Sequence, residues 1–345
     1  MNRDTFDSVE NFSAAFATGL SDMLEHEGLG VFILVCANAG FDERIQRQLA
    51  QRLRQRFDEY SEQYRNALCH GRTLPDADAD DDVLVFLKIM AVGFDALQPT
   101  QRRAEGPWEL QFNQLRAFRP PRMAHTKVNI LHAPFNENGF HFNKPFLRKE
   151  CFWSGELQGR EVELLYNKFP FVDFHGLLVP QREHNAPQFL THDDHHYMWR
   201  VSEELGCTLP GVGFGYNAYG GFASVNHLHF QMFLRETPLP VQLPQWRHNG
   251  GEQDYPSRVE RFDNVEAAWR YIETMHRGGD SYNLLYLPGE IYCLPRRIQG
   301  SYQHAPWTGG FAWYEMCGGM VSFSHEDYSQ LSSKMIEAEF YRLAV

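Results

Sequence analysis

The sequence predicts an α+β protein, with a helical N-terminal region followed by a mostly antiparallel sheet and packed helices. In the first hundred residues, apolar side chains recur at spacings of three and four, the period of an amphipathic helix. From about Trp108 onward, short apolar runs between turn residues predict strands. Helical patterns interrupt these strands near residues 192–205, 264–276 and 325–342.

The N-terminal region, residues 1–106, is expected to form an accessory helical layer or a partner surface. Apolar positions between Ile45 and Leu68 predict one long helix. A second helix is expected after Asp80–Asp82, because acids before an apolar run favour a helix N-terminus over a metal site. The run Gly30–Ala37 fits either a buried strand or a helical turn, and its periodicity does not distinguish the two.

The most informative segment is Asn226–Leu234, in which polar and apolar residues alternate. In an extended strand, His227, His229 and Gln231 share one face and the apolar residues between them share the other. Burying such polar groups without partners costs about 1–3 kcal/mol each. We therefore expect this face to meet a polar ligand. The alternative is a solvent-facing strand with chance histidines.

A glycine-rich segment, Gly211–Ser224, leads into this motif. Glycine lets backbone amides approach a ligand closely, although glycines also serve hairpins and bulges. Beside the histidine face, the segment indicates a phosphate-binding turn. Its candidate phosphate contacts are Asn217, Gly220, Gly221 and Ser224.

The run Ser224–Gln231 resembles the active-site strand of the histidine triad (HIT)-like superfamily, in its transferase branch. Hydrolases of that superfamily carry a third His where this chain has Gln231. The longer run Gly215–Gln231 is most similar to the GDP-hexose phosphorylases, which act on GDP-L-galactose or GDP-D-glucose. Ala218 departs from their usual Ser. Further similar segments are Gln111–Arg116, Pro134–Lys144 and Trp313–Val321, so the resemblance covers about residues 107–345.

The resemblance implies a HIT-like fold and nucleotidyl transfer, and the three polar residues fit that chemistry. A neutral imidazole is a nucleophile near pH 7, so His229 is the expected nucleophile, held in one tautomer by a carbonyl of the glycine-rich turn. His227 would support the site or contact a phosphate. Gln231 cannot titrate and offers only hydrogen bonds to the phosphoryl oxygens, which favours transfer over hydrolysis.

The segment Asn167–Pro170 resembles a different branch, the diadenosine tetraphosphate phosphorylases. That resemblance makes Asn167 a candidate nucleotide contact and Lys168 a candidate phosphate contact. The alternative is that Asn167 caps a turn and Lys168 is solvated. His175 is expected to be structural. Candidate base contacts, each more often a core residue, are Trp153, Phe169, Phe171 and Tyr219.

A similar order of residues occurs twice, with Tyr166-Asn167 before Val179-Pro180 and Tyr282-Asn283 before Leu294-Pro295. This repetition predicts two similar halves, as in the transferase branch. The catalytic half covers about residues 107–240 and the degenerate half about 241–345, because the second copy lacks His-x-His.

Arg296 and Arg297 follow the second copy directly. Paired guanidinium groups can hold a phosphate bidentately. The alternative is a solvated strand end.

Neither a metal nor a cofactor is expected. The six cysteines are scattered without C-x-x-C, which argues against a zinc ribbon or a haem attachment. The histidine-rich run Thr191–His196 is the strongest metal candidate, but Thr191 with Asp194 three residues later is typical of a capping box that opens a helix.

The composition indicates a chain with a substantial core, since 43% of its 345 residues are hydrophobic and 14% aromatic. A net charge of −12 argues against a nucleic-acid partner. The longest apolar run, Gly30–Ala37, is too short to span a bilayer, and the start lacks signal-peptide character. We therefore expect a cytoplasmic protein without a membrane partner. A homodimer follows only from the resemblance.

The leading functional hypothesis is phosphorolysis of a GDP-hexose to hexose 1-phosphate and GDP through a nucleotidyl-histidine. Its partners would be a nucleoside diphosphate sugar, or a dinucleotide, with inorganic phosphate or a sugar 1-phosphate. One alternative is a diadenosine polyphosphate phosphorylase (ATP adenylyltransferase). The other is a catalytically silent nucleotide-binding regulator, which is less consistent with the presence of His229.

Overall fold

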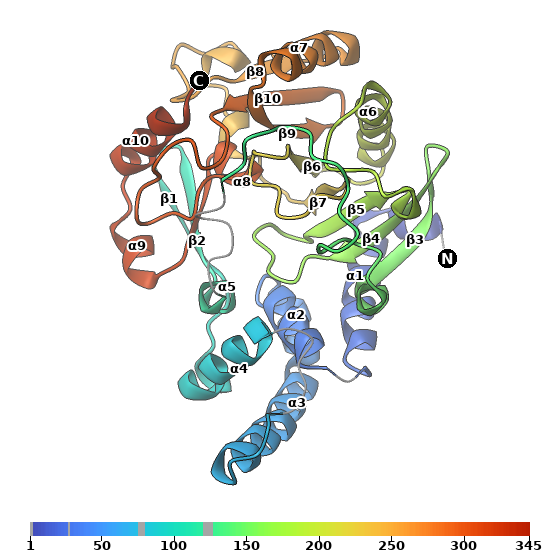
Figure 1. Ribbon diagram of the computed structural model, residues 1–345, viewed down its shortest axis with the longest axis vertical. Coiled ribbons are helices and arrows are strands. Elements are labelled where there is room, and N and C mark those ends of the chain that lie inside the picture. Colours follow the sequence, from blue (N-terminus) through green and yellow to red (C-terminus); the bar gives the residue numbers. More distant parts are fainter. Residues whose placement is uncertain (1–2, 27, 75–79, 120–126) are drawn as a thin grey trace.

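The computed structural model describes residues 3–26, 28–74, 80–119 and 127–345. The described part contains an eight-stranded sheet in the order β3-β4-β5-β7-β6-β9-β10-β8, in which all neighbouring strands are antiparallel. A three-stranded sheet, β1-β2-β11, lies beside it (Figure 1). This arrangement confirms the predicted α+β class with a mostly antiparallel sheet.

The strands of the larger sheet are β3 Cys151–Leu157, β4 Arg160–Tyr166, β5 Gly176–Pro180, β6 Val212–Asn217, β7 Phe230–Leu234, β8 Glu260–Phe262, β9 Ser281–Leu287 and β10 Glu290–Arg296. Those of the smaller sheet are β1 Gln101–Glu105, β2 Trp108–Phe112 and β11 Gly319–Ser322. The α-helices are α1 Val9–Met23, α2 Leu29–Ala39, α3 Glu43–Cys69, α4 Asp80–Val92, α5 Gln114–Phe118, α6 His192–Gly206, α7 Val265–Gly278, α8 Trp313–Met316, α9 His325–Gln330 and α10 Ser333–Leu343.

Two of the N-terminal helices, α3 and α4, are those that the sequence predicts, whereas α1 was not predicted. The apolar spacing between Ile45 and Leu68 lies within α3, whose apolar side chains are buried mainly at spacings of four. The run Gly30–Ala37 belongs to α2, and all eleven residues of this helix are buried. A helix that is buried on every side has no polar face, which explains why periodicity alone did not identify it. None of the described helices is both long enough and apolar enough to cross a membrane.

The C-terminal helices match the prediction with one interruption. The helices expected near residues 192–205 and 264–276 are α6 and α7, and Thr191 caps α6 by accepting from the backbone N–H of Asp194. The pattern at residues 325–342 forms two helices, α9 and α10. The segment Trp313–Val321, which resembles a closing strand, begins with the helical turn α8 and ends in β11.

The structure contains a repeated unit of one helix and two strands, but it is not aligned as the sequence suggested. Helix α6 leads into β6 and β7, α7 leads into β9 and β10, and the two helices contact each other. At the centre of the sheet, β6 pairs with β9, so that Asn217 lies opposite Asn283. The rings of Tyr216 and Tyr282 stack with centroids 6.1 Å apart.

The alignment with Tyr166-Asn167 was wrong because the strand registers differ. Tyr166 pairs with Gly176 at the end of β4, whereas Tyr282 pairs with Pro295 near the start of β9. The boundaries of the two halves remain a prediction. The proposed division at residue 106 falls in the turn of the β1–β2 hairpin, so the two regions share a sheet there.

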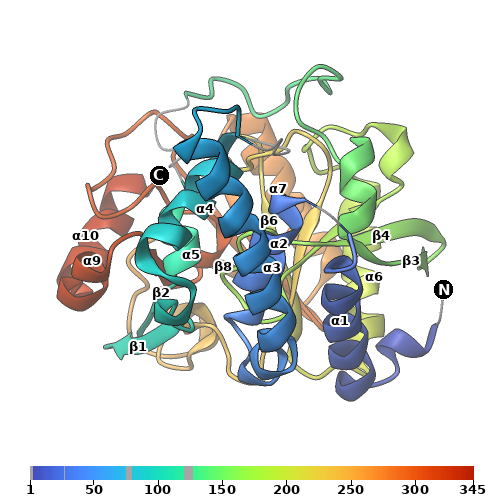
Figure 2. The ribbon, with the colours of Figure 1, turned by 90° about the horizontal axis from the view of Figure 1, so that it is seen from below.

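The N-terminal helices pack on the end of β4 and the segment that follows it (Figures 1 and 2). The hydroxyl of Tyr166 donates to the carbonyl of Phe16 in α1 at 2.6 Å, and Asn38 in α2 donates to the carbonyl of Asn167 at 3.0 Å. In α4, the carboxylate of Asp82 holds the ammonium group of Lys168 at 2.7 Å. These contacts fix the helical region to the sheet.

The ion pair between Asp82 and Lys168 predicts a measurable stability effect. The Asp82 side chain is 2% exposed, so the variant Lys168→Met leaves a buried carboxylate without its counterion. We expect the free energy of unfolding in urea to fall by roughly 2–3 kcal/mol, somewhat less than for a fully buried pair. The double variant Asp82→Asn/Lys168→Met should recover much of the loss, and the exposed Lys334→Met should change little. An unchanged free energy in Lys168→Met would contradict this role.

Candidate active site

The histidine motif only partly follows the predicted strand. Strand β7 begins at Phe230, so His227 and His229 lie in the irregular segment that leads into it. The expectation of one continuous strand from Asn226 was therefore wrong. The apolar face is confirmed, since Leu228, Phe230 and Met232 are at most 3% exposed and belong to the main core.

His229 is held in a single tautomer. Its Nδ1 lies 2.7 Å from the backbone carbonyl of His227, which can only accept, so Nδ1 carries the proton and Nε2 carries the lone pair. Burial lowers the pKa of His229 to about 4, so the ring is neutral at pH 7. The predicted acceptor in the glycine-rich turn was wrong, because the carbonyl of His227 occupies that role.

The backbone of His229 is fixed by Gln188, which the sequence did not single out. The Oε1 atom of Gln188 accepts from the amide of His229 at 2.9 Å, and its Nε2 donates to the carbonyl of His229 at 3.2 Å. The same Nε2 donates to the carbonyl of Asn217 at 2.9 Å. One buried amide therefore joins the nucleophile segment to the end of β6.

His227 has a supporting role, because both of its ring nitrogens are bonded to backbone groups. Its Nδ1 accepts from the amide of Phe142 at 3.2 Å, and its Nε2 donates to the carbonyl of Arg182 at 3.0 Å. Burial and the neighbouring His229 lower its pKa to about 4. A phosphate contact would require breaking one of these bonds. Phe142 therefore contacts both histidines, His227 through its amide and ring and His229 through its ring.

Gln231 is oriented by two donors. Its Oε1 accepts from the indole N–H of Trp313 at 3.0 Å and from Nε2 of His175 at 3.0 Å. An indole nitrogen only donates, so this contact identifies the oxygen of the amide and leaves its NH₂ group to donate elsewhere. Gln231 lies in β7 opposite Gly215 and Leu177. The contact with Trp313 thus determines which end of the Gln231 side chain accepts and which end can donate.

His175 was expected to be structural, and it is a positioning residue for Gln231. Its Nδ1 accepts from the amide of Phe171 at 3.3 Å, so its proton is on Nε2, as the bond to Gln231 requires. Burial lowers its pKa to about 3, which keeps it neutral. The amide nitrogen of Asn167 lies 3.2 Å from the same Nε2. Because that nitrogen carries the proton, this is a contact and not a second hydrogen bond.

Several polar groups of the glycine-rich turn form hydrogen bonds within the protein. Gly220 has the positive φ of 96°, and the amide of Gly221 donates to the carbonyl of Ala218 at 2.7 Å. The side-chain oxygen of Asn217 accepts from Asn283 at 2.7 Å and from the amide of Trp313 at 2.8 Å. Of the predicted phosphate contacts, Ser224 is exposed. The amide of Gly221 and the side-chain oxygen of Asn217 build the turn instead.

The guanidinium group of Arg296 is not available to bind a phosphate. That group is buried and donates to the carbonyls of Phe311 and Arg297 and to the hydroxyl of Tyr302. Arg297 is exposed, and its amide donates to the carbonyl of Leu343 at 2.8 Å. These contacts fix the C-terminal segment and argue against the predicted phosphate role of Arg296, whereas that of Arg297 remains a prediction.

The segment after β4 is a structured turn. The side-chain oxygen of Asn167 accepts from the amide of Phe169 at 3.1 Å, which is the turn-capping alternative, and Lys168 is paired with Asp82 instead of being solvated. Among the aromatic candidates, Phe171 lies near the site, with its ring centroid 4.3 Å from that of His175. Trp153 packs in the core against Phe6.

The sequence is similar to GDP-hexose phosphorylases. Residues 100–233 match the family model of the GDPGP1-like N-terminal domain. The chain is 33% identical over 108 residues to GDP-D-glucose phosphorylase 1 of Danio rerio, which covers 31% of each protein. It is 30% identical over 131 residues to the enzyme of that name from Homo sapiens, covering 36% of this chain and 32% of the relative.

A plant protein, GDP-L-galactose phosphorylase 1 of Arabidopsis thaliana, is 33% identical over 76 residues, covering 22% of this chain and 17% of the relative. Among solved structures, the yeast Ap4A phosphorylase Apa2 aligns with a TM-score of 0.49 at 17% identity, covering 77% of this chain and 95% of that one. The matched part spans about a third or less of these curated relatives. The comparisons confirm the predicted resemblance to GDP-hexose phosphorylases.

Proposed function

We propose that the protein is a nucleotidyltransferase that carries the nucleotidyl group on His229 and passes it to inorganic phosphate, so that it acts as a phosphorylase. The observation that carries this proposal is the tautomer of His229. Its Nδ1–H is donated to the carbonyl of His227 and its pKa is about 4, so a neutral Nε2 lone pair is available at pH 7.

The first step forms a phosphorus–nitrogen bond. Nε2 of His229 attacks the α-phosphorus of a nucleoside diphosphate sugar, and the bond from that phosphorus to the bridging oxygen breaks. The sugar 1-phosphate leaves with the electron pair. The ring now bears a positive charge, and the carbonyl of His227 stabilises it by accepting from Nδ1–H.

The second step reverses the first with a different acceptor. An oxygen of inorganic phosphate attacks the α-phosphorus, and Nε2 leaves with its electron pair as a neutral imidazole. The product is the nucleoside diphosphate. Neither step requires a proton from the residue at position 231, which agrees with an amide at Gln231.

Gln231 supports this reaction by donating from its NH₂ group to the phosphoryl oxygens, where negative charge concentrates. Trp313 and His175 hold the amide oxygen, so the donor does not have to reorient during the reaction. Ser224 is an exposed candidate for a phosphate contact. Gly220 contributes by allowing the turn, with its positive φ.

GDP-hexose is the proposed substrate class, and its products are hexose 1-phosphate and GDP. Support comes from the names of the similar proteins, which are GDP-D-glucose and GDP-L-galactose phosphorylases. A diadenosine polyphosphate remains the second candidate, because the segment Asn167–Pro170 resembles that of the diadenosine tetraphosphate phosphorylases. A homodimer and a cytoplasmic location remain predictions.

A covalent intermediate should be detectable on His229. Incubating the protein with GDP-glucose, GDP-galactose or diadenosine tetraphosphate labelled at the α-phosphorus should give acid-labile protein-bound label with the GDP-hexoses. The label should be lost in His229→Ala and kept in the exposed control His325→Ala. The variant His227→Gln should keep label at a reduced rate.

Three outcomes would contradict parts of this proposal. Label that persists in His229→Ala would place the nucleophile elsewhere. Turnover of diadenosine tetraphosphate alone would replace GDP-hexose as the substrate class. Absence of both label and turnover with every nucleotide would favour the silent nucleotide-binding regulator.

The donor role of Gln231 can be separated from its structural role with Gln231→Glu. The carboxylate still accepts from Trp313 and His175 but has no NH₂ group. Burial of its charge should lower the melting temperature, so circular dichroism at pH 8 checks that the fold is kept. At pH 8, kcat for phosphorolysis should fall by about 100-fold or more, as for loss of one transition-state donor. The variant Gln231→Leu should lose both activity and stability. Near-normal kcat in Gln231→Glu would remove this residue from the mechanism.

The low pKa of His229 predicts an unusual pH profile. The neutral ring attacks, so the rate of nucleotidyl-histidine formation should lose nothing to protonation of His229 between pH 8 and about pH 5. The rate should fall as the pH drops through about 4. Single-turnover labelling at each pH, with circular dichroism to confirm the fold, measures this. A half-maximal rate near pH 6.5, the ordinary pKa of histidine, would show that burial does not lower the pKa of His229.

A further inference from the structure

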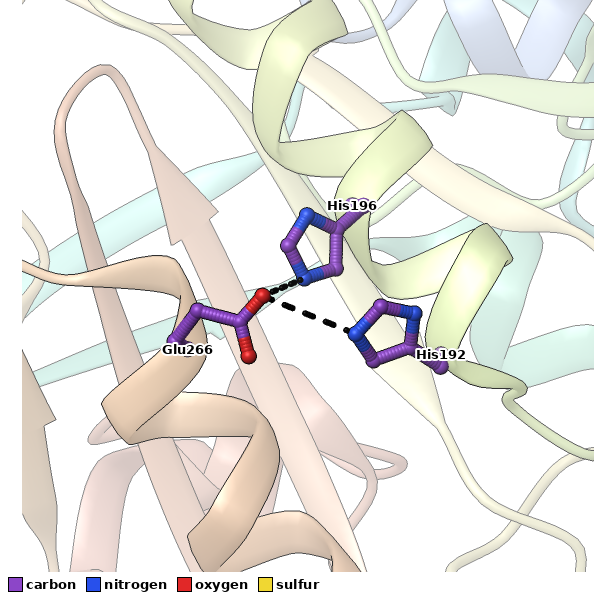
Figure 3. A group of neighbouring side chains, drawn as sticks. All are labelled: His192, His196 and Glu266. Carbon is purple, nitrogen blue, oxygen red and sulfur yellow. Dashed lines mark ion pairs between the residues drawn. The ribbon is translucent and has the colours of Figure 1, made fainter.

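Three side chains converge where the first turns of α6 and α7 meet (Figure 3). His192 and His196 are four residues apart on α6, so they lie on one face of the helix. Glu266 comes from the first turn of α7. From this convergence we propose that the three residues bind a zinc ion that joins the two helices.

The distances suit a single ion. Oε1 of Glu266 lies 3.1 Å from Nε2 of His196 and 3.7 Å from Nε2 of His192, and the three ligand atoms all lie within 4.8 Å of one another. In a tetrahedral site with zinc bonds of about 2.0–2.1 Å, neighbouring ligand atoms are about 3.4 Å apart. Small side-chain rotations therefore complete the geometry, and one position remains for water.

The lone pair of His196 is available for a ligand. Its Nε2 is buried and has no hydrogen-bond partner among the described residues, although the Glu266 carboxylate is 3.1 Å away. That carboxylate therefore faces the ring nitrogen without a hydrogen bond. An ion between the two groups would satisfy both of them.

The neighbouring residues hold the site in place. His195 donates from Nε2 to the carbonyl of Val265 at 3.0 Å and contacts the hydroxyl of Tyr286 through Nδ1 at 2.8 Å. The hydrogen bond to Val265, the residue before Glu266, fixes the start of α7 relative to α6. Nδ1 of His192 lies 3.5 Å from the carboxylate of Asp193, in the arrangement by which a carboxylate orients a metal-binding imidazole.

The ligand set favours zinc over magnesium or calcium. Magnesium and calcium prefer oxygen ligands, whereas two imidazoles and one carboxylate suit zinc and similar transition metals. The side chains of His192 and Glu266 are 48% and 55% exposed, so an ion can reach them from solvent. Because α6 leads into β6 and α7 into β9, a bound zinc would stabilise the centre of the sheet.

The zinc proposal is compatible with the capping box that the sequence predicted. Thr191 and Asp194 form the cap, while His192 and His196 project from the same helix towards α7. The sequence predicts no metal here because the run Thr191–His196, taken alone, is typical of a capping box. Glu266, the third ligand, is distant in the sequence.

Isothermal titration of the full chain with zinc chloride, after treatment with a chelator, tests the proposal. The background variant Cys69→Ser/Cys207→Ser removes the two exposed thiols, because a free thiol can compete for zinc. We expect one zinc equivalent per chain. The affinity should fall at least tenfold in His192→Ala and in Glu266→Gln, and it should be unchanged in the exposed control His70→Ala.

Cobalt provides a second measurement that depends on coordination. Cobalt(II) bound in place of zinc should give intense tetrahedral absorption bands, which the double variant His192→Ala/His196→Ala should lack. Zinc should raise the melting temperature of the parent protein and not that of Glu266→Gln. Equal zinc affinity in the parent and the double variant, or identical cobalt spectra, would overturn the proposal.

Discussion

The hydrogen bond from Nδ1 of His229 to the carbonyl of His227 is the interaction on which the proposed chemistry depends. It places the proton on one nitrogen and the lone pair on the other, and burial keeps the ring neutral. Its two partners are only two residues apart in the sequence, so the bond requires the backbone of residues 227–229 to be held in one conformation. Gln188 holds that backbone from a different segment through two hydrogen bonds to His229, and a third bond ties it to the carbonyl of Asn217.

Around this bond, the two parts of the larger sheet have unequal tasks. In the pair β6–β7, strand β7 follows the two histidines along the chain and carries Gln231. In the pair β9–β10, strand β9 supplies Asn283, which donates to the side chain of Asn217. Trp313, from beyond the second pair, reaches both Gln231 and Asn217. The part without a histidine motif thus positions the part that has one.

The sequence predicted the features that depend on local patterns. The spacing of apolar residues identified α3, and alternation identified Leu228, Phe230 and Met232 as core residues. A recognisable motif identified His229 and Gln231 as candidates, and the structure brings supporting contacts to both.

The missed features depend on contacts between distant segments. Gln188 and Trp313 carry no local signal, because their roles come from the residues that they meet after folding. Lys168 resembled a phosphate contact until its partner Asp82, from α4, was located. Arg296 follows a strand as a phosphate-binding arginine would, but folding surrounds it with carbonyls. A local pattern does not identify the distant partner, and in these cases the partner determines the role.

The continuity of the larger sheet also limits how a substrate can enter. Strands β6 and β9 join the two repeated units by backbone pairing, and the bond between Asn217 and Asn283 crosses the same junction. A hinge between the units would have to break this ladder, so they behave as one rigid body. Opening of the site therefore falls to connecting segments such as residues 127–144, which contact His227 through the amide of Phe142 and the rings of Phe135, His141 and Phe142. Access is then governed by the movement of a loop and not by domain closure.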